Sequence, residues 1–264
     1  MEILDIGPDS PQFMAVYDEL LREAFLPDEL MSAEEFREAA QHGTLWVTGA
    51  IHDGRPAGAA VAEWSQDSQV LLLSYIAVRP DLRGTGIGGQ LMTAVHTTWQ
   101  DRVHPLLTLA ELEHPHAHQR HTQYGDPIKR LRFYARHNAL ALDLPYFQPA
   151  MKPGGRRVPG MILALLAAAP GFASAGVAPA GPVRAFMTEY LTQTEGRIGL
   201  DTDPEGAALF QAMSAADIRL LPLDARHLVL AGYQDGSRLK PHRRQAVLDE
   251  ASNAAAQQAW TNGI

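Results

Sequence analysis

The period of hydrophobic and polar positions changes several times along the first 168 residues, which predicts alternating strands and helices. Alternation over residues 2–6 predicts a strand. The apolar residues that follow at helical spacing predict a helix that buries Phe13, Val16, Leu20 and Leu21. The run from Ser32 to Glu35 predicts the start of a second, short helix, because serine and glutamate at this spacing satisfy free amide groups of the first turn.

Apolar runs at 44–51, 57–64 and 70–78 predict three strands. Asp53 and Gly54 favour a hairpin between the first two, because Asp-Gly accepts positive φ. A helix should follow the third strand, with a buried stripe at Ile87, Leu91, Ala94, Val95 and Thr98.

Residues 106–112, 139–143 and 158–168 predict three more strands, and 127–137 predict a helix that ends at a left-handed Asn138. The expected order is therefore β-α-α-β-β-β-α-β-α-β-β. Such an order predicts an α/β fold with a mixed sheet and helices on both faces.

The pattern changes after residue 168. Residues 169–182 are rich in Ala, Gly and Pro, which is typical of a connector. Residues 183–264 then form a C-terminal extension of unknown role, with helical signals at 183–194, 204–213 and 243–260 and short apolar runs at 218–221 and 228–230. We expect one domain over 1–168, followed by this connector and extension.

Composition narrows the class of protein. A formal net charge of -8 argues against a nucleic-acid partner, which would favour a basic face. The apolar run 161–169 is shorter than the roughly 20 residues of a membrane span, and residues 1–6 do not resemble a signal peptide. We therefore expect a cytoplasmic protein without a membrane partner. The absence of cysteine excludes an acyl-cysteine intermediate and thiolate metal ligands.

Four glycines follow Arg83 within six residues, at the start of the predicted helix: Gly84, Gly86, Gly88 and Gly89. Glycine lets backbone amides approach an anion closely, and the start of a helix adds free N–H groups and a positive dipole end. This pattern predicts a pyrophosphate cradle. It also satisfies G-x-G-x-x-G, so a nucleotide-binding oxidoreductase is an alternative. In a Rossmann unit, however, the glycines follow their strand directly, whereas Arg79 to Arg83 intervene here.

The longer pattern, Arg83-Gly-Thr-Gly86-Ile-Gly88, resembles motif A of the GNAT superfamily of N-acetyltransferases, Gln/Arg-x-x-Gly-x-Gly/Ala. Residues 76–80 also resemble the strand end that precedes this motif. Residues 130–139 resemble a second family segment, a helix that ends in a Tyr-containing turn, with Asn138-Ala139 where the family usually has Gly-Phe. The resemblance covers residues 1–168 and implies a GNAT-type mixed, partly splayed central sheet flanked by helices.

The resemblance implies acetyl-CoA as acyl donor and an amine of a small molecule or peptide as acceptor. The implied CoA-binding residues are Ile76, Ala77, Val78, Arg83, Gly84, Thr85, Gly86, Ile87 and Gly88. Tyr134 matches the family tyrosine that protonates the departing CoA thiolate, a role that suits a phenol with a pKa near about 10. Transfer should be direct, in a ternary complex, because no cysteine can carry the acyl group.

An ammonium acceptor must lose a proton before its nitrogen can attack the thioester. Glu111 and Glu113 share one face at the end of a predicted strand, and Glu111 lies deeper, beside the expected opening of the sheet. Glu111 is therefore our first choice of base, and Glu63 is the second. A purely solvating or cation-binding role for these carboxylates remains an alternative.

The histidines at 114, 116, 118 and 121 are of a type that ligates metals, yet alternating spacing in a loop without cysteine favours a substrate-lining loop. No metal is predicted. The alternative function is a non-catalytic acyl-CoA-binding or regulatory protein, because an intact glycine motif serves either. The sequence leaves the acceptor, the acyl length and the oligomeric state open, with a dimer among the options.

Overall fold

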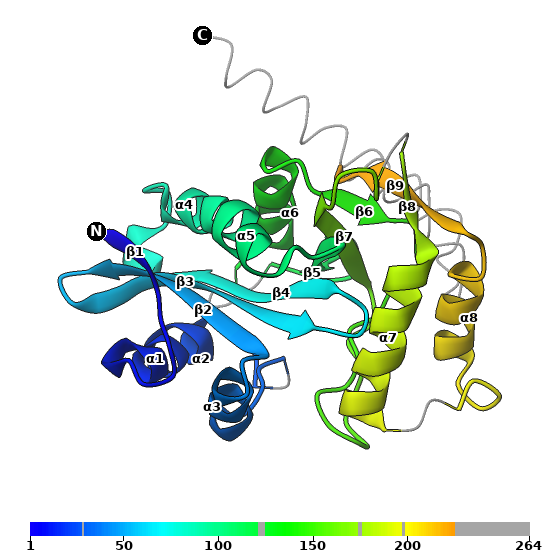
Figure 1. Ribbon diagram of the computed structural model, residues 1–264, viewed down its shortest axis with the longest axis horizontal. Coiled ribbons are helices and arrows are strands. Elements are labelled where there is room, and N and C mark those ends of the chain that lie inside the picture. The colour runs from blue at the N-terminus through cyan, green and yellow to red at the C-terminus, as the bar shows by residue number, and fades with distance from the viewer. Residues whose placement is uncertain (28, 121–124, 174–175, 197–198, 225–264) are drawn as a thin grey trace, which may run out of the picture.

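The computed structural model describes residues 1–27, 29–120, 125–173, 176–196 and 199–224 (Figure 1). In these residues the strands form a nine-stranded sheet in the order β1-β2-β3-β4-β5-β7-β6-β9-β8. The strands are β1 Glu2–Asp5, β2 Leu45–His52, β3 Arg55–Ser65, β4 Val70–Val78, β5 Leu107–Glu113, β6 Leu140–Leu142, β7 Met161–Ala168, β8 Val177–Pro179 and β9 Asp217–Pro222. The helices are α1 Pro11–Val16, α2 Arg22–Ala24, α3 Ala33–Gln41, α4 Ile87–Ala94, α5 Gln100–Val103, α6 Pro127–Arg136, α7 Ala180–Glu195 and α8 Pro204–Ala212.

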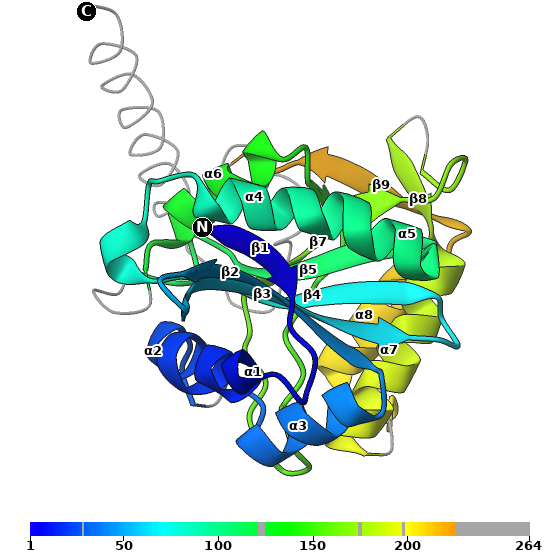
Figure 2. The same cartoon turned by 60° about the vertical axis from the view of Figure 1, so that its left-hand side comes forward.

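Helices cover both faces of the sheet (Figures 1 and 2). Helices α4, α5 and α6 lie on one face, over a core cluster that includes Leu91 and Leu112. On the other face, α1 and α3 cover β2 to β4 around Phe36, and α7 covers β5 and β7 around Leu109. The predicted α/β class, with a mixed sheet between helices, is confirmed.

Three local predictions are confirmed by the geometry. Ser32 Oγ accepts the amide of Glu35 at 3.2 Å, and a Glu35 carboxylate oxygen accepts the amide of Ser32 at 2.8 Å. Asp53 and Gly54 have φ values of 51° and 74°, as a tight hairpin with a positive-φ pair requires. Asn138, with φ 60°, follows the end of α6 in the left-handed conformation.

The predicted buried stripe of the helix after β4 is wrong at Thr98. Thr98 is exposed, and Trp99 is fully buried in its place. A π-helical turn spans Val95–Trp99 between α4 and α5, and such a turn contains an extra residue. The turn therefore rotates the following residues out of the 3.6-residue phase. Trp99 points inward, and its Nε1 donates to Thr48 Oγ1 at 3.1 Å.

The sheet opens between β4 and β5, which are parallel. Their pairing runs from Val70 opposite Leu107 to Leu73 opposite Ala110 and goes no further. A register shift with β3 lies at the same point, because Leu73 and Tyr75 have consecutive partners and Ser74 is left without one. Beyond Leu73 the two strands diverge, so the predicted splay is present.

The part of the chain after residue 168 continues the same sheet. β9 pairs with β6, and β8, which lies inside the predicted connector 169–182, pairs with β9. Helix α7 buries Val183, Phe186 and Met187 in the core beside β5 and β7. The predicted division into domain, connector and extension stays a prediction, and the run 228–230 and the helix 243–260 lie outside the described residues.

Candidate active site

The loop between β4 and α4, which contains Gly84 and Gly86 and is called the glycine loop below, presents backbone amides at an exposed surface. Gly84 and Gly86 have φ values of 84° and 92°, a region that favours glycine. A Cβ at either position would meet no atom within 4 Å. Helix α4 starts after Gly86 without a side-chain cap, and the amides of Gly84, Gly86, Ile87 and Gly88 have no acceptor among the described residues. Thr85 Oγ1 stays inside the loop and donates to Leu82 O at 2.7 Å. The loop is thus suited to bind a phosphate group.

Beside this loop, β4 has a free backbone edge. Because β5 pairs only as far as Leu73, no β5 residue lies opposite Ile76, Ala77 or Val78. A free strand edge can accept an extended ligand as one more strand. Arg83 folds back onto this edge, and its Nε donates to Val78 O at 3.3 Å. A ligand that paired with the Val78 carbonyl would displace the Arg83 side chain.

Tyr134 lies on α6, at the face of the sheet covered by α4 and α6. Its side chain is buried in the core cluster that includes Leu112 of β5. Burial raises the pKa of the Tyr134 phenol to about 12, and the nearby Arg130 opposes the rise. A phenol with such a pKa stays protonated at neutral pH and can act as a proton donor.

Glu111 lies on β5 at the point where the sheet opens, and its side chain points to the opposite face, toward α7. Tyr146 Oη donates to Glu111 Oε1 at 2.5 Å, and Tyr190 Oη donates to Oε2 at 3.3 Å. Gln148 Nε2 also reaches Oε2, at 3.4 Å. Burial raises the pKa of Glu111 to about 7, although the bonds from Tyr146 and Tyr190 lower it. This carboxyl group can therefore exchange a proton near neutral pH.

Further acidic groups surround Glu111 on the same face. Glu63 of β3 accepts a hydrogen bond from Ser74, and burial raises its pKa. Burial also raises the pKa of Glu29, and the charge of Glu113 adds to the rise. Glu113 itself pairs with Arg130 Nη1 at 2.9 Å. Glu113 is thus engaged in an ion pair, whereas Glu111 and Glu63 are held by hydroxyl groups.

Sequence reasoning missed three residues of this site, Tyr146, Gln148 and Tyr190. The first two lie in the loop between β6 and β7, and Tyr190 lies on α7. No local pattern marks a tyrosine that reaches a carboxylate dozens of positions away. The signal available was the predicted opening beside Glu111, because a buried carboxylate needs hydrogen-bond donors from some neighbouring segment.

The histidine-rich loop contacts the segment before β7. His118 Nε2 lies 2.9 Å from Pro159 O, and His118 Nδ1 lies 3.6 Å from a Glu113 carboxylate oxygen. The amide of His116 donates to His114 Nδ1 at 3.2 Å. No group of three His, Cys, Asp or Glu side chains in the described residues could hold a metal ion. The predicted His121 lies outside those residues.

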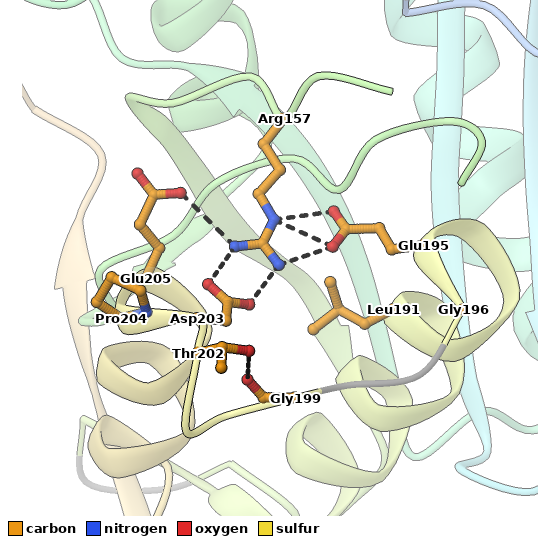
Figure 3. Close-up of a pocket in the computed structure, with 9 residues that line it drawn as sticks. All are labelled: Arg157, Leu191, Glu195, Gly196, Gly199, Thr202, Asp203, Pro204 and Glu205. Atoms are coloured by element: carbon orange, nitrogen blue, oxygen red, sulfur yellow. Dashed lines mark hydrogen bonds and ion pairs between the residues drawn. The ribbon is translucent and has the colours of Figure 1, made fainter. Parts of the chain in front are cut away.

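A separate pocket of about 480 Å³ lies between the end of α7 and the start of α8 (Figure 3). Arg157 fills its centre, donates to Glu195 and Asp203 at 2.5–3.1 Å, and stacks over Phe147 with its Cζ 4.2 Å from the ring centre. The Arg157 guanidinium lowers the pKa of Asp203. Glu195 Oε1 also accepts the amide of Ala150. Because the Arg157 guanidinium is already paired with carboxylates, we interpret these ion pairs as structural. They hold the β6–β7 loop against the end of α7 and the start of α8.

Replacing Arg157 with methionine should destabilise the protein by about 2–3 kcal/mol, because Glu195 and Asp203 would lose their partner at a largely buried position. Arg55→Met is the matched control: its pair with Glu19 has a similar length of 2.7 Å but is exposed, so about 0.5 kcal/mol is expected. Urea unfolding of both variants measures the difference. Equal losses of unfolding free energy in the two variants would show that the ion pairs of Arg157 contribute no more than an exposed pair.

Glu111→Gln should stabilise the protein more at about pH 8 than at about pH 5. The folded pKa of Glu111 lies above its ordinary value, so its contribution to stability falls as pH rises from about 4.5 to about 7. The variant lacks this loss, which amounts to up to about 3 kcal/mol. The measurement is the free energy of unfolding in urea at both pH values. A difference between variant and wild type that does not change with pH would contradict the raised pKa.

Residues 13–122 match the model of the acetyltransferase (GNAT) family. This match includes the glycine loop, Glu63 and Glu111, and it ends before α6. No curated protein sequence matches the chain significantly. Every helix in the described residues is too short or too polar to cross a membrane.

Solved structures with similarity to this chain include three acetyltransferases. A proposed GNAT-family enzyme from Bacteroides thetaiotaomicron is 20% identical, with a TM-score of 0.49, and the match covers 82% of this chain and 98% of that one. The ribosomal-protein-S18-alanine N-acetyltransferase from Escherichia coli is 17% identical, with a TM-score of 0.45 and coverages of 64% and 95%. A GNAT-family enzyme from Elizabethkingia anophelis with acetyl-CoA bound is 16% identical, with a TM-score of 0.42 and coverages of 62% and 96%. At such scores these structures carry no information on the substrate of this chain.

Proposed function

Because this chain carries a domain of the acetyltransferase (GNAT) family over residues 13–122, we propose that it transfers an acetyl group from acetyl-CoA to an amine of a small molecule or peptide. The observation that carries the proposal is the pairing of two features at one opening of the sheet. One is the set of amides at Gly84, Gly86, Ile87 and Gly88 that have no acceptor among the described residues, and the other is the buried carboxyl group of Glu111.

The glycine loop fits the donor. Its open space and free amides would bind the pyrophosphate of acetyl-CoA, and the free edge at Ile76 to Val78 would pair with the pantetheine arm. Arg83 would leave Val78 and move toward the phosphates. This arrangement would place the thioester in the opening between β4 and β5.

Two groups on opposite faces of the sheet would handle the protons. Glu111 takes a proton from the ammonium group of the acceptor, directly or through water, which frees the nitrogen lone pair for attack on the thioester carbonyl. Tyr134 gives a proton to the departing CoA thiolate. Glu63 is the second candidate for the base. Direct transfer in a ternary complex is consistent with a chain that contains no cysteine.

Calorimetric titration with acetyl-CoA, beside a parallel titration with NADH, tests the donor half of this proposal. Binding of acetyl-CoA and no binding of NADH are expected. Binding of NADH in place of acetyl-CoA would favour the oxidoreductase interpretation of the glycine pattern. Activity with an amine then separates an enzyme from an acyl-CoA-binding protein of the same fold.

A further inference from the structure

The carboxylate of Glu111 is held by two tyrosines that come from outside the family-matched residues 13–122. Tyr146 belongs to the loop between β6 and β7, and Tyr190 belongs to α7. Each phenol donates a hydrogen bond to a different carboxylate oxygen, Tyr146 to Oε1 and Tyr190 to Oε2. A carboxylate with a donor at both oxygens has a fixed orientation.

The segments that carry these tyrosines are themselves fixed. Tyr146 is buried against the core that α7 completes. Arg157 lies in the same loop and forms an ion pair with Glu195, the last residue of α7. Glu195 lies more than one helical turn after Tyr190. Glu189, which neighbours Tyr190, accepts a hydrogen bond from Ser65 at the end of β3. The loop and the helix are thus tied to each other and to the sheet on both sides of the Glu111 contact.

We propose that Tyr146 and Tyr190 are positioning residues, which hold the Glu111 carboxylate in one orientation at the opening of the sheet and make α7 a part of the active site. This inference rests on the proposed function, in which Glu111 accepts the proton of the acceptor ammonium. The proton transfer turns the carboxylate into a neutral carboxylic acid and the ammonium into a free amine.

The two tyrosines also act on the titration of Glu111. Burial favours the neutral acid, whereas the two phenol donors favour the carboxylate. The other titratable groups that face this site are Glu63 on β3, Glu29 between α2 and α3, and Tyr75 on β4. The charges of Glu63 and Glu29 both raise the pKa of Glu111. No arginine, lysine or histidine of the described residues is among the main groups that set the pKa of Glu111. The phenols are therefore the groups that keep Glu111 available as a carboxylate near neutral pH.

The test is a direct titration of Glu111 in the full chain by NMR, with ¹³C-labelled glutamate carboxyl groups and the signal assigned through its absence in Glu111→Gln. Tyr146→Phe removes one donor and should raise the midpoint of Glu111 by about one pH unit. Tyr190→Phe, whose bond is longer, should raise it by less. Tyr17→Phe removes a buried hydroxyl that donates to Met31 O at 2.8 Å and should leave the midpoint unchanged.

Near-ultraviolet circular dichroism identifies variants that keep the native fold. An unchanged midpoint in folded Tyr146→Phe and Tyr190→Phe would overturn the proposal, as would an equal rise in Tyr17→Phe. Acetyl-CoA affinity, measured by calorimetry on the same samples, should be the same in all of them. Failure of the wild-type protein to bind acetyl-CoA would count against the proposed function, whereas the titration would still decide whether the tyrosines control Glu111.

Discussion

Gly86→Val should abolish acetyl-CoA binding in a protein that remains folded. Gly86 has φ 92° at the start of α4, next to the free amides, and a Cβ there would meet no atom within 4 Å. A valine side chain would fill the space in which a phosphate group must lie to accept those amides. The backbone strain of a branched residue at positive φ adds a cost of about 1–2 kcal/mol, which a folded domain can tolerate.

Gly54→Val is the matched control for this strain. Gly54 has φ 74° and lies in the β2–β3 hairpin instead of the glycine loop, and a Cβ there would likewise meet no atom within 4 Å. Both variants should lose similar stability, and Gly54→Val should bind acetyl-CoA as the wild type does. Calorimetry shows the difference. Unchanged affinity in Gly86→Val would mean that the loop does not hold the pyrophosphate.

Glu111→Gln and Tyr134→Phe should each lower the rate of acetyl transfer by about 10²–10⁴-fold, with little change in acetyl-CoA affinity. Both changes keep the shape of the side chain and remove a group that can exchange a proton. Since the two residues lie on opposite faces of the sheet, each should act on a different step, the loss of a proton by the amine and the gain of one by the thiolate.

Their pH profiles should differ. The wild-type rate should rise with pH through about 7, because the carboxylate form of Glu111 is the active base above its pKa. In Glu111→Gln that limb should vanish, and the residual rate should rise at higher pH as free amine becomes available. Wild-type rates in both variants, measured with an established amine acceptor, would show that neither residue transfers a proton.

Strands, helix starts and turns could be predicted because local rules determine them. The capping box at Ser32, the Asp53-Gly54 hairpin and the left-handed Asn138 each depend on residues within a few positions. The glycine loop is local in the same way: its free amides follow from where a strand ends and a glycine-rich helix begins. The inward position of Trp99 could not be predicted, because the 3.6-residue period of the sequence gives no sign of the π turn at Val95–Trp99.

The hydrogen-bond partners of Glu111 could not be predicted from the sequence, for a related reason. The resemblance to the GNAT family implied an opening of the sheet beside Glu111, and in the structure Glu111 follows the last β4–β5 pair. Tyr146 and Tyr190, however, reach it from the β6–β7 loop and from α7, and α7 packs in one core cluster with β9 and β8, which extend the sheet. That extension begins in a segment whose Ala, Gly and Pro content predicts a connector. Contacts set by tertiary packing leave no local periodicity to detect.

The most direct test of the account is the release of free CoA thiol from acetyl-CoA in the presence of a panel of amines, with the acetylated amine identified by mass spectrometry. Since the chain contains no cysteine, the protein itself contributes no thiol to the signal. We expect thiol release that requires an amine and is matched by an equal amount of acetylated product. Tight binding of acetyl-CoA without amine-dependent thiol release across the panel would contradict the account and identify the protein as an acyl-CoA-binding protein.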